Sequence, residues 1–355
     1  MTNPELPIRQ ELREELDRDI ASRAPVEDSA RALLRVSNLK MYFPVTKGLL
    51  KRKVGDVKAV DDVTFSVQHG ETLGLVGESG SGKSTIGNCV LGNCKVTSGQ
   101  IIYDGRDIAQ ISKAEMRALR KELTTVTQDP FASLNPRMTV EDIILEGARA
   151  HKLISGKKEG EELVERMLTL VGLNPQVASR FPHEFSGGQR QRISIARALA
   201  MNPSFIVCDE IVSALDVSIQ AQIVGLMMKI QQELGLTYIF IGHDLSVVRH
   251  LSNNVAVMYL GKIMELTDSD ELYAHPLHPY TQALISAAPI PNPTADRARE
   301  RILLEGEVPS PINPPKGCNF CTRCKYADER CRTEEPPMVD VGNNHQVACH
   351  RVTGA

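Results

Sequence analysis

Hydrophobic and polar residues alternate between Leu33 and Val67, and the pattern changes farther along the chain. β-branched and apolar residues take alternate positions in two stretches, ALLRVSNLKMYF and VKAVDDVTFSV, which is typical of half-buried strands. Short continuous apolar runs follow in TLGLVG, SFIVCDE and TYIFIGH, as in a parallel sheet that is covered on both faces. The stretch from Phe131 to His183 has helical periodicity, clearest in VERMLTLVGL. Strands that alternate with helical stretches predict an α/β domain.

The two ends of the chain depart from this pattern. Residues 1–30 are rich in Glu, Arg and Asp, and their helix-like stretch ELREELDRDIASR has few apolar positions to bury. A solvated helix or a disordered tail is therefore favoured over a docking segment. A linker begins near residue 288, and the remainder is rich in Pro and Cys, which predicts a small C-terminal extension.

Composition narrows the class of protein. The chain has 355 residues, of which 42% are hydrophobic and 24% charged, an ordinary balance for a soluble protein with a buried core. No apolar run approaches the ~18 residues that cross a bilayer, and the charged N-terminus differs from a signal peptide. We therefore expect a cytosolic protein that reaches a membrane through partners. The net charge of −3 argues against nucleic acid as the main ligand.

A glycine-rich loop follows the apolar run TLGLV and precedes a helix-like stretch. It fits the phosphate-binding pattern G-x-x-x-x-G-K-S/T with Gly77, Glu78, Ser79, Gly80, Ser81, Gly82, Lys83, Ser84 and Thr85. Glycines let backbone N–H groups curl around phosphates without a Cβ clash. Lys83 would reach the β- and γ-phosphates of a nucleotide, and the Ser84 hydroxyl would ligate Mg²⁺. Alone, this loop indicates a nucleoside triphosphatase and no narrower class.

Two more polar groups lie at the ends of predicted elements. The strand SFIVCDE ends in Asp209 and Glu210, where one carboxylate can hold Mg²⁺ through water and the other can act as general base. Alone, this pair is equally well explained as a strand that ends in a polar turn. The sequence SGGQ, before ISIARALA, leaves backbone N–H groups free at a helix start, which makes a second anion site.

The order of these motifs explains the second anion site through a resemblance. A phosphate loop, SGGQ, an apolar strand ending in DE and a strand-end histidine are together similar to the ABC ATPase family over Leu33–Asp270. The resemblance implies an ABC-type nucleotide-binding domain with a RecA-like core and a helical subdomain at about residues 131–185. It also implies that two such domains dimerise head to tail, with each ATP between one subunit's phosphate loop and the other's SGGQ.

The resemblance gives roles to residues that match the family's motifs. Gln128 matches the glutamine that senses Mg²⁺ and the attacking water, and with Ser84 and Asp209 it would form the Mg²⁺ site. Glu210 matches the general base. His243 matches the histidine that contacts the γ-phosphate, although a lone histidine after a strand is more often structural. The resemblance extends the ATP-binding surface to Ser186, Gly187, Gly188, Gln189 and Asp216.

The adenine contact and two departures from the family pattern complete the predicted ATP site. Phe43 aligns best with the family's aromatic residue that stacks on adenine, and the adjacent Tyr42 is the alternative. Either could instead be a core residue. Phe185 stands where many members have Leu, and Ile211 where Pro is common. Neither departure removes a catalytic group.

Three further stretches indicate a subfamily. KGLLKRKVGDVKAVDDVTFSV and QDPFASLNPRMTV resemble the dipeptide and oligopeptide importer ATPases, and HPLHPYTQALISAAP resembles the start of their C-terminal extension. This implies a heterodimer with a homologous ATPase, two permease subunits and an extracytoplasmic peptide-binding protein. The chain would then lie peripherally on the cytoplasmic face of the cell membrane. Nickel, microcin, glutathione and oligosaccharide importers share the pattern, so the cargo stays open.

Five of the eight cysteines crowd near the C-terminus, which in a reducing compartment indicates metal binding rather than disulfides. The subfamily resemblance implies a 4Fe–4S cluster on Cys318, Cys324, Cys331 and Cys349, with Cys321 left out. Zinc is the alternative, because the two residues between Cys318 and Cys321 also fit zinc spacing, and an unmetallated tail is the third possibility. The other three, Cys89, Cys94 and Cys208, are expected to be core residues.

The chain is thus predicted to have three parts: a charged tail over 1–30, an ABC nucleotide-binding domain over 31–288 and a Cys-rich extension over 289–355. The predicted function is ATP hydrolysis that drives peptide import. The alternative from another class is a soluble ABC protein that acts on ribosomes or DNA. Such proteins usually carry two nucleotide domains or long inserts, and this sequence has one phosphate loop. Exporter ATPases are often fused to a transmembrane domain, for which the sequence has no candidate.

Overall fold

A computed structural model of the chain describes residues 32–48, 52–129, 133–288 and 301–353. The predicted charged tail over 1–30 and the start of the predicted linker lie outside these residues. The chain divides into two units, and each is described by itself. The first unit contains Gln68–Gly70 and Arg117–Thr237, and the second contains Ala32–Val67, Glu71–Met116 and Tyr238–Ala355.

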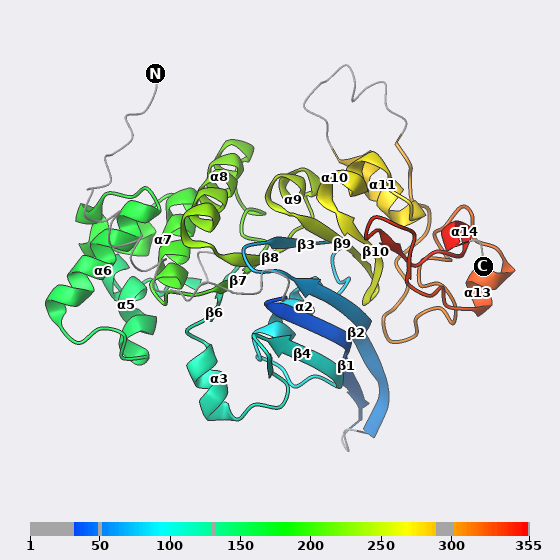
Figure 1. Ribbon diagram of the computed structural model, residues 1–355, viewed down its shortest axis with the longest axis horizontal. Helices are drawn as coiled ribbons and strands as arrows, with labels where there is room; N and C mark the ends of the chain where they lie inside the picture. The colour runs from blue at the N-terminus through cyan, green and yellow to red at the C-terminus, as the bar shows by residue number, and fades with distance from the viewer. Residues whose placement is uncertain (1–31, 49–51, 130–132, 289–300, 354–355) are drawn as a thin grey trace. The chain divides into compact units, whose positions relative to one another are not determined.

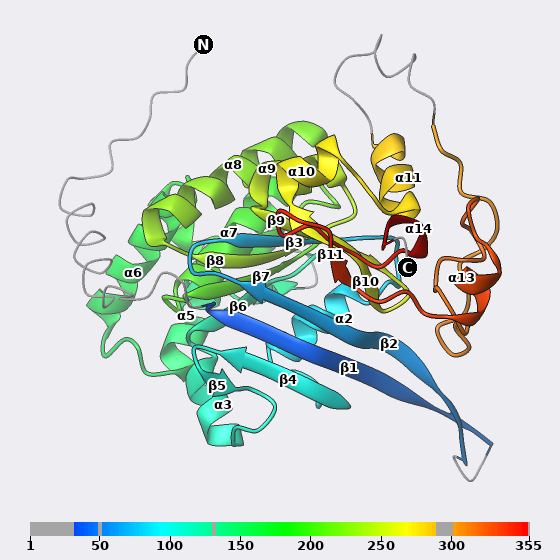
Figure 2. The same cartoon turned by 45° about the vertical axis from the view of Figure 1, so that its right-hand side comes forward.

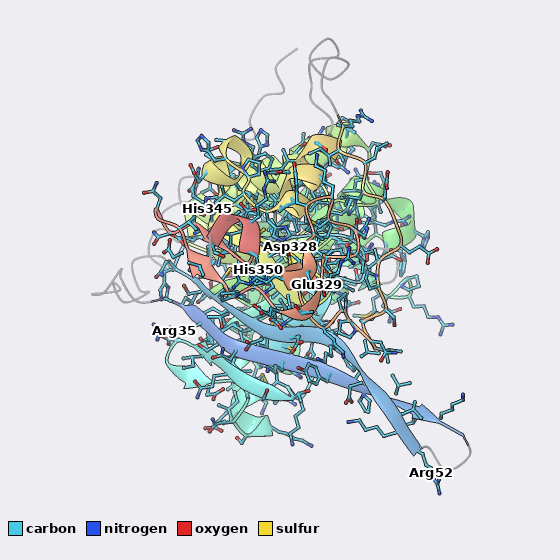
Figure 3. All side chains as sticks on the ribbon, turned by 90° about the vertical axis from the view of Figure 1, so that its right-hand side faces the viewer. Arg35, Arg52, Asp328, Glu329, His345 and His350 are labelled. Carbon is cyan, nitrogen blue, oxygen red and sulfur yellow. The ribbon has the colours of Figure 1, made fainter. Side chains whose placement is uncertain are left out.

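An antiparallel sheet in the second unit confirms the two alternating stretches as strands. Its strand order is β2-β1-β4-β5, with β1 at Leu34–Lys47, β2 at Arg52–Val67, β4 at Ser98–Tyr103 and β5 at Arg106–Asp107. Buried apolar side chains recur along β1 and β2, with register shifts at bulges that bend the pair. Figure 2 shows β1, β2 and β4 side by side. Figure 3 shows Arg35 and Arg52 at opposite ends of the long β1–β2 hairpin.

A second sheet of this unit holds the strand that precedes the phosphate loop. Its strand order is β11-β12-β10-β9-β3-β8, with β3 at Thr72–Val76, β8 at Thr237–Ile241, β9 at Asn254–Tyr259 and β10 at Lys262–Asp268. β3 is buried at all five positions and pairs in parallel with both β8 and β9. This central place explains its continuous apolar sequence. The helices of this part are α2 (Lys83–Val90), α9 (Leu245–Leu251), α10 (Ser269–Ala274) and α11 (Pro279–Ala287), and α3 (Lys113–Leu119) lies at the boundary of the units.

The first unit combines two parallel strands with the predicted helical region. β6 (Leu123–Val126) pairs with β7 (Phe205–Asp209). The helical stretch resolves into α5 (Val140–Ala150), α6 (Lys157–Leu170) and two 3₁₀ turns, Pro175–Ser179 and Pro182–Glu184, followed by α7 (Gly187–Leu199) and α8 (Val217–Leu234). α6 ends before Gly172, which takes a positive φ of 72°. Across the described ranges, no helix is both long and apolar enough to span a membrane.

The C-terminal segment, residues 301–353, is built into the second unit's sheet. Its regular elements are short: α13 (Glu329–Thr333), β11 (Val339–Asp340), β12 (Gln346–Val347) and α14 (His350–Thr353). β12 pairs with β10, and in Figure 1 the red ribbon follows that strand. The buried His345 donates from Nε2 to Oε1 of the buried Glu265 at 2.7 Å. Backbone N–H groups of Leu277 and His278 donate to the same carboxylate.

A buried histidine makes the second unit sensitive to acid. His278 is 1% exposed, and its Nδ1 accepts the N–H of Tyr280 at the start of α11. Burial lowers the pKa of His278 to about 3. The unfolded chain binds this proton below about pH 6.5, whereas the folded chain excludes it down to about pH 3. The stability from this group is therefore complete above pH 6.5 and falls as the pH drops through that window.

We expect the native protein to lose about 2 kcal/mol of unfolding free energy from this group between about pH 7.5 and pH 5. His278→Asn keeps an acceptor for the Tyr280 N–H but has no proton to bind. Urea unfolding at the two pH values measures both proteins. The variant should show a pH dependence that is smaller by that amount, and equal pH dependence in both would contradict the prediction.

Candidate functional site

The phosphate loop connects the end of β3 to the start of α2 in the second unit. Gly77, Gly80 and Gly82 all take positive φ values, of 147°, 77° and 104°. Such values are costly for residues with a Cβ, so the loop needs glycine at these positions. A Cβ on Gly77 would lie 2.2 Å from the Met258 carbonyl oxygen, and one on Gly82 would lie 2.1 Å from that of Ala59. The loop is therefore held directly against the backbones of β9 and β2.

The Lys83 side chain closes over this loop. Its ammonium donates to the carbonyl oxygens of Gly77 at 2.8 Å and Glu78 at 2.9 Å. Ser84 lies next to it in the first turn of α2, with its side chain exposed. Backbone N–H groups of a glycine-rich turn, a helix N-terminus, an ammonium and a hydroxyl are the groups that bind a nucleotide's phosphates and its Mg²⁺. The loop, Lys83 and Ser84 together therefore suit the phosphates and Mg²⁺ of a nucleotide.

The register of the parallel strands places His243 at the same sheet edge as the loop. β3 pairs with β8 so that Leu75 lies opposite Ile241. Two residues farther along, Gly77 begins the phosphate loop and His243 follows β8 with its side chain exposed. Ligand sites of open α/β sheets lie at this carboxyl edge. The second unit thus brings together the loop and the histidine that the sequence predicted.

The two aromatic candidates for adenine differ in their surroundings. The Tyr42 hydroxyl donates to the Asp61 carboxylate, and burial together with this hydrogen bond raises the pKa of Tyr42. The Asp61 pKa is lowered although burial opposes this, because Tyr42 and nearby lysines stabilise the carboxylate. Phe43 is 43% exposed on the same strand. Phe43 is the more exposed of the two rings, so it stays the first candidate for stacking and Tyr42 the alternative.

The acidic strand end belongs to the first unit. Val126 of β6 lies opposite Cys208 of β7, so Gln128 and Glu210, each two residues farther, leave the sheet at the same level. The Gln128 side-chain amide donates to Oε2 of Glu210 at 2.8 Å. Glu210 takes a positive φ of 49°, an uncommon backbone conformation for a residue with a side chain. Asp209, the last residue of β7, lies directly before it.

The SGGQ sequence starts α7 with a reciprocal cap. Ser186 Oγ accepts the Gln189 N–H at 3.4 Å, and Gln189 Oε1 accepts the Ser186 N–H at 3.0 Å. The sequence led us to expect free N–H groups here, and the cap occupies two that flank Gly187 and Gly188. These glycines form the first turn of α7, where backbone N–H groups have no carbonyl partner within the helix.

The start of α8 packs against this first turn. A Cβ on Gly188 would lie 2.6 Å from Ile219 Cγ2, so glycine is needed for this approach. Asp216 is the N-cap residue of α8, and its side chain is exposed. The first unit thus places the SGGQ sequence and Asp216 at two helix starts that lie close together.

Two residues at the phosphate loop escaped the sequence prediction. The Glu78 N–H donates to the Tyr280 hydroxyl at 2.9 Å, and the Glu78 carboxylate accepts from Arg323 Nη1 at 2.7 Å. Tyr280 belongs to the stretch HPLHPY, which served only as a subfamily mark, and Arg323 lies between two cysteines. No local pattern shows that residues more than 200 positions away meet Glu78.

The C-terminal cysteines lie near one another. Burial raises the pKa of the Cys318 thiol to about 12, and the charges of Cys321, Cys331 and Cys349 add to that rise. Burial also raises the pKa of the Cys324 thiol, and the charge of Cys349 adds to that rise. His350 Nε2 donates to the Glu334 carbonyl oxygen, which ties α14 to the end of α13, and Figure 3 shows this segment with Asp328, Glu329 and His350 labelled.

The cysteines are not arranged as a site for a single ion. Within the described ranges, no group of three or more His, Cys, Asp or Glu side chains is arranged to hold a metal ion. Thiolates around one zinc ion sit at about 2.3 Å from the metal, which forces them close together. The prediction for the other cysteines is met at Cys89 and Cys208, which are buried, whereas Cys94 is partly exposed with its Sγ 3.2 Å from that of Cys89.

The sequence matches two family models. Residues 60–213 match the ABC transporter family, and residues 264–331 match the C-terminal region of oligopeptide/dipeptide transporters. The chain is 56% identical over 319 residues to the oligopeptide transport ATP-binding protein AppF of Bacillus subtilis, with 90% of this chain and 97% of that protein covered. It is 48% identical over 329 residues to OppF of Escherichia coli, the oligopeptide transport ATP-binding protein, with 92% and 98% covered.

Solved structures give the same picture for the fold. The dimeric ATP-binding cassette MJ0796, in a post-hydrolysis state with ADP and phosphate, superposes with a TM-score of 0.59 at 26% identity, over 66% of this chain and 98% of that one. CbiO1 of Clostridium perfringens, part of the ABC transporter complex CbiONQ, gives 0.59 at 27% identity, over 69% and 91%. The predicted α/β nucleotide-binding fold is confirmed.

Proposed function

The chain belongs to the ATP-binding proteins of the oligopeptide ABC transporters, and on that premise we propose that it couples ATP hydrolysis to the import of short peptides. The hydrolytic part of the proposal is carried by the hydrogen bond between Gln128 and Glu210, in a chain that also has an intact phosphate loop, and the transport part by the match to peptide transporters. A carboxylate held by an amide at the end of a strand is suited to orient and deprotonate an attacking water. The chain is an ABC-type ATPase.

Within this proposal the groups of the ATP site divide the tasks of binding and hydrolysis, and Gln128 has two of them. Lys83 neutralises charge on the β- and γ-phosphates. Ser84, Gln128 and Asp209 would hold Mg²⁺, which would screen the phosphate charge. Glu210 takes the proton of the attacking water, with Gln128 fixing one of its carboxylate oxygens. His243 contacts the γ-phosphate. Phe43 supports the adenine ring, with Tyr42 engaged by Asp61.

A second ATP-binding surface would serve a partner. Ser186, Gly187, Gly188 and Gln189 present a helix start, and Asp216 lies on the neighbouring one. We propose that this surface binds the γ-phosphate of ATP held by a homologous ATPase subunit, and that the partner does the same in return. Two ATP molecules would then be enclosed in a head-to-tail heterodimer, whose closure and reopening drive the cycle.

The remaining partners follow from the family. We propose that the heterodimer docks on two permease subunits from the cytoplasmic face of the membrane, and that an extracytoplasmic binding protein delivers the peptide. The match of residues 264–331 to the C-terminal region of peptide transporters favours peptide over nickel, glutathione or oligosaccharide as cargo. The proposed parts of the chain remain a tail over 1–30, a nucleotide domain over 31–288 and an extension over 289–355.

We expect Glu210→Gln to lower ATP turnover at its own site by about 100-fold or more, because it removes the proposed base. ATP binding should persist, with nucleotide trapped in a closed dimer. Turnover and retained radiolabelled ATP, measured on the variant assembled with its partner subunits, check this. Glu233→Gln, which removes an α8 carboxylate that pairs with Lys229, is the matched control and should keep normal turnover. Near-normal turnover in Glu210→Gln would rule out Glu210 as the base.

The import role predicts which proteins accompany the chain. Affinity purification of the tagged chain from detergent-solubilised native membranes, followed by mass spectrometry, should recover two multi-spanning permeases and a second ABC ATPase. A binding protein recovered with them would identify the cargo through its ligand. Recovery from the soluble fraction together with ribosomal or DNA-repair proteins would overturn the import role and leave the ATPase assignment standing.

We also propose that Cys318, Cys324, Cys331 and Cys349 hold a 4Fe–4S cluster with a structural role. The fold supports this by bringing two of the four together, because the Cys318 N–H donates to the Cys331 carbonyl oxygen at 2.8 Å, and iron–sulfur clusters are held by cysteine thiolates. A cluster of four irons spaces its thiolates more widely than a single zinc ion does. Zinc remains the alternative, and the experiment must distinguish it from the 4Fe–4S cluster.

Anaerobically purified protein should therefore contain iron and acid-labile sulfide in equal amounts. Cys324→Ser should lose both. Cys321→Ser is the matched control from the same segment and should keep both. Zinc without iron in the anaerobic protein would refute the cluster, and loss of iron in Cys321→Ser would show that the ligand set is wrong.

A further inference from the structure

Arg323 joins the cysteine-rich segment directly to the phosphate loop. It lies between Cys321 and Cys324, and its side chain is only 8% exposed. Nη1 donates to Oε2 of Glu78 at 2.7 Å. Glu78 is the residue after Gly77, so its carboxylate belongs to the loop that is proposed to receive the phosphates. Both residues lie in the second unit.

Aromatic packing fixes the position of the Arg323 guanidinium. It lies over the Tyr259 ring, 5.8 Å from the centroid, and Nη1 is 3.4 Å from the Tyr259 hydroxyl. Phe320 packs edge-on against Tyr259, with centroids 5.3 Å apart, and also contacts Tyr280. A buried, stacked guanidinium has little freedom to leave its partner. The ion pair with Glu78 therefore has a fixed geometry, unlike a mobile ion pair on the surface.

The same segment also reaches the loop through the β9–β10 turn. The buried Asn319 side chain donates to the Leu260 carbonyl oxygen at 3.0 Å. The next residue, Gly261, donates its N–H to the Ser81 carbonyl oxygen at 2.9 Å. Residues 319–323 thus hold the loop at two places, through the turn at Ser81 and through the ion pair at Glu78.

Charge gives this contact a consequence for nucleotide binding. A carboxylate within a phosphate-binding loop repels the phosphates, and the repulsion is strong where water is partly excluded. Arg323 cancels that charge through a charge-assisted hydrogen bond and keeps the carboxylate in one place. The Glu78 N–H is fixed by the Tyr280 hydroxyl at the same time.

We propose that Arg323 is a positioning residue for ATP binding, which acts by holding and neutralising Glu78 of the phosphate loop. The inference rests on the proposed assignment of this loop as the ATP site. It makes the cysteine-rich segment part of the support of the nucleotide site. It gives Arg323 no role in the chemical step, so nucleotide affinity should change while the turnover rate at saturating ATP should not.

The test compares nucleotide binding and turnover in variants of the full chain. Isothermal titration with Mg–ATP should show affinity about 10-fold weaker in Arg323→Gln, the size expected for one lost charge-assisted hydrogen bond. Turnover at saturating ATP, in the assembly with its partner subunits, should stay within about twofold. Arg323→Lys keeps the charge but not the planar fork and should fall between the two. Arg330→Gln, which breaks the exposed pair with Glu334 in the same segment, is the matched control and should bind ATP normally.

A double variant separates this role from a general loss of structure. If the uncompensated Glu78 carboxylate causes the weak binding, Glu78→Gln combined with Arg323→Gln should recover most of the lost affinity. Unchanged affinity in Arg323→Gln would overturn the proposal. A double variant that binds ATP no better than Arg323→Gln would also overturn it, because removing the Glu78 charge would then have restored nothing.

A variant of Lys83 separates the assignment of the loop as the ATP site from the role of Arg323. Lys83→Ala should abolish detectable ATP binding, because it removes the cation that the loop supplies to the phosphates. Normal binding by Lys83→Ala would refute the ATP-site assignment itself. Lost binding in Lys83→Ala with normal binding in Arg323→Gln would refute only the role of Arg323.

Discussion

The second unit depends on how closely the phosphate loop approaches two strands. Gly77 lies against the carbonyl of Met258 in β9, and Gly82 lies against that of Ala59 in β2. β2 belongs to the antiparallel sheet and β9 to the mixed one, in which it pairs in parallel with β3 and antiparallel with β10, so the loop is packed between backbones of both sheets. The Gly261 carbonyl adds a link by accepting the Asp61 N–H. A Cβ at either glycine would push the sheets and the loop apart, which explains why the loop sequence has so little freedom.

Parallel pairing then determines which polar residues can meet. In the second unit the pairing of Leu75 with Ile241 brings the loop and His243 to one edge. In the first unit the pairing of Val126 with Cys208 brings Gln128 to Glu210. Each partner lies two residues beyond the last paired position, where the chain leaves the sheet. Groups at such positions are held by largely buried strands, and this gives them a fixed spacing.

Local sequence predicted the parts whose structure is decided locally. TLGLV, SFIVCD and TYIFI became β3, β7 and β8, because a continuous apolar run ending in a polar turn has few other solutions. The loop residues were recognisable because phosphate binding requires glycine and lysine at fixed spacing. The first turn of α7 differed from the expectation of free N–H groups, because Ser186 and Gln189 each accept the other's N–H. The stretch with helical periodicity is divided into several helices, and Gly156 and Gly172 flank α6 within it.

Long-range contacts were beyond reach of the sequence. Nothing in HQVACH shows that His345 meets Glu265 inside the unit, or that β12 joins β10. A run of prolines and cysteines predicts a separate extension, because it has no apolar period that would pack on a sheet. The structure instead uses single buried polar residues to attach it, and such residues carry no periodic signal.

The C-terminal segment has too little regular structure to be stable alone. Its strands have two residues each and its helices four or five, all far shorter than elements that persist in isolation. It must draw its order from β10, from Glu265 and from the β9–β10 turn. Because Glu78 and the turn at Gly261 are in turn held by this segment, the dependence is mutual. Thermodynamic linkage requires that a ligand that orders the loop also stabilises the segment, to the same extent that an ordered segment favours the ligand.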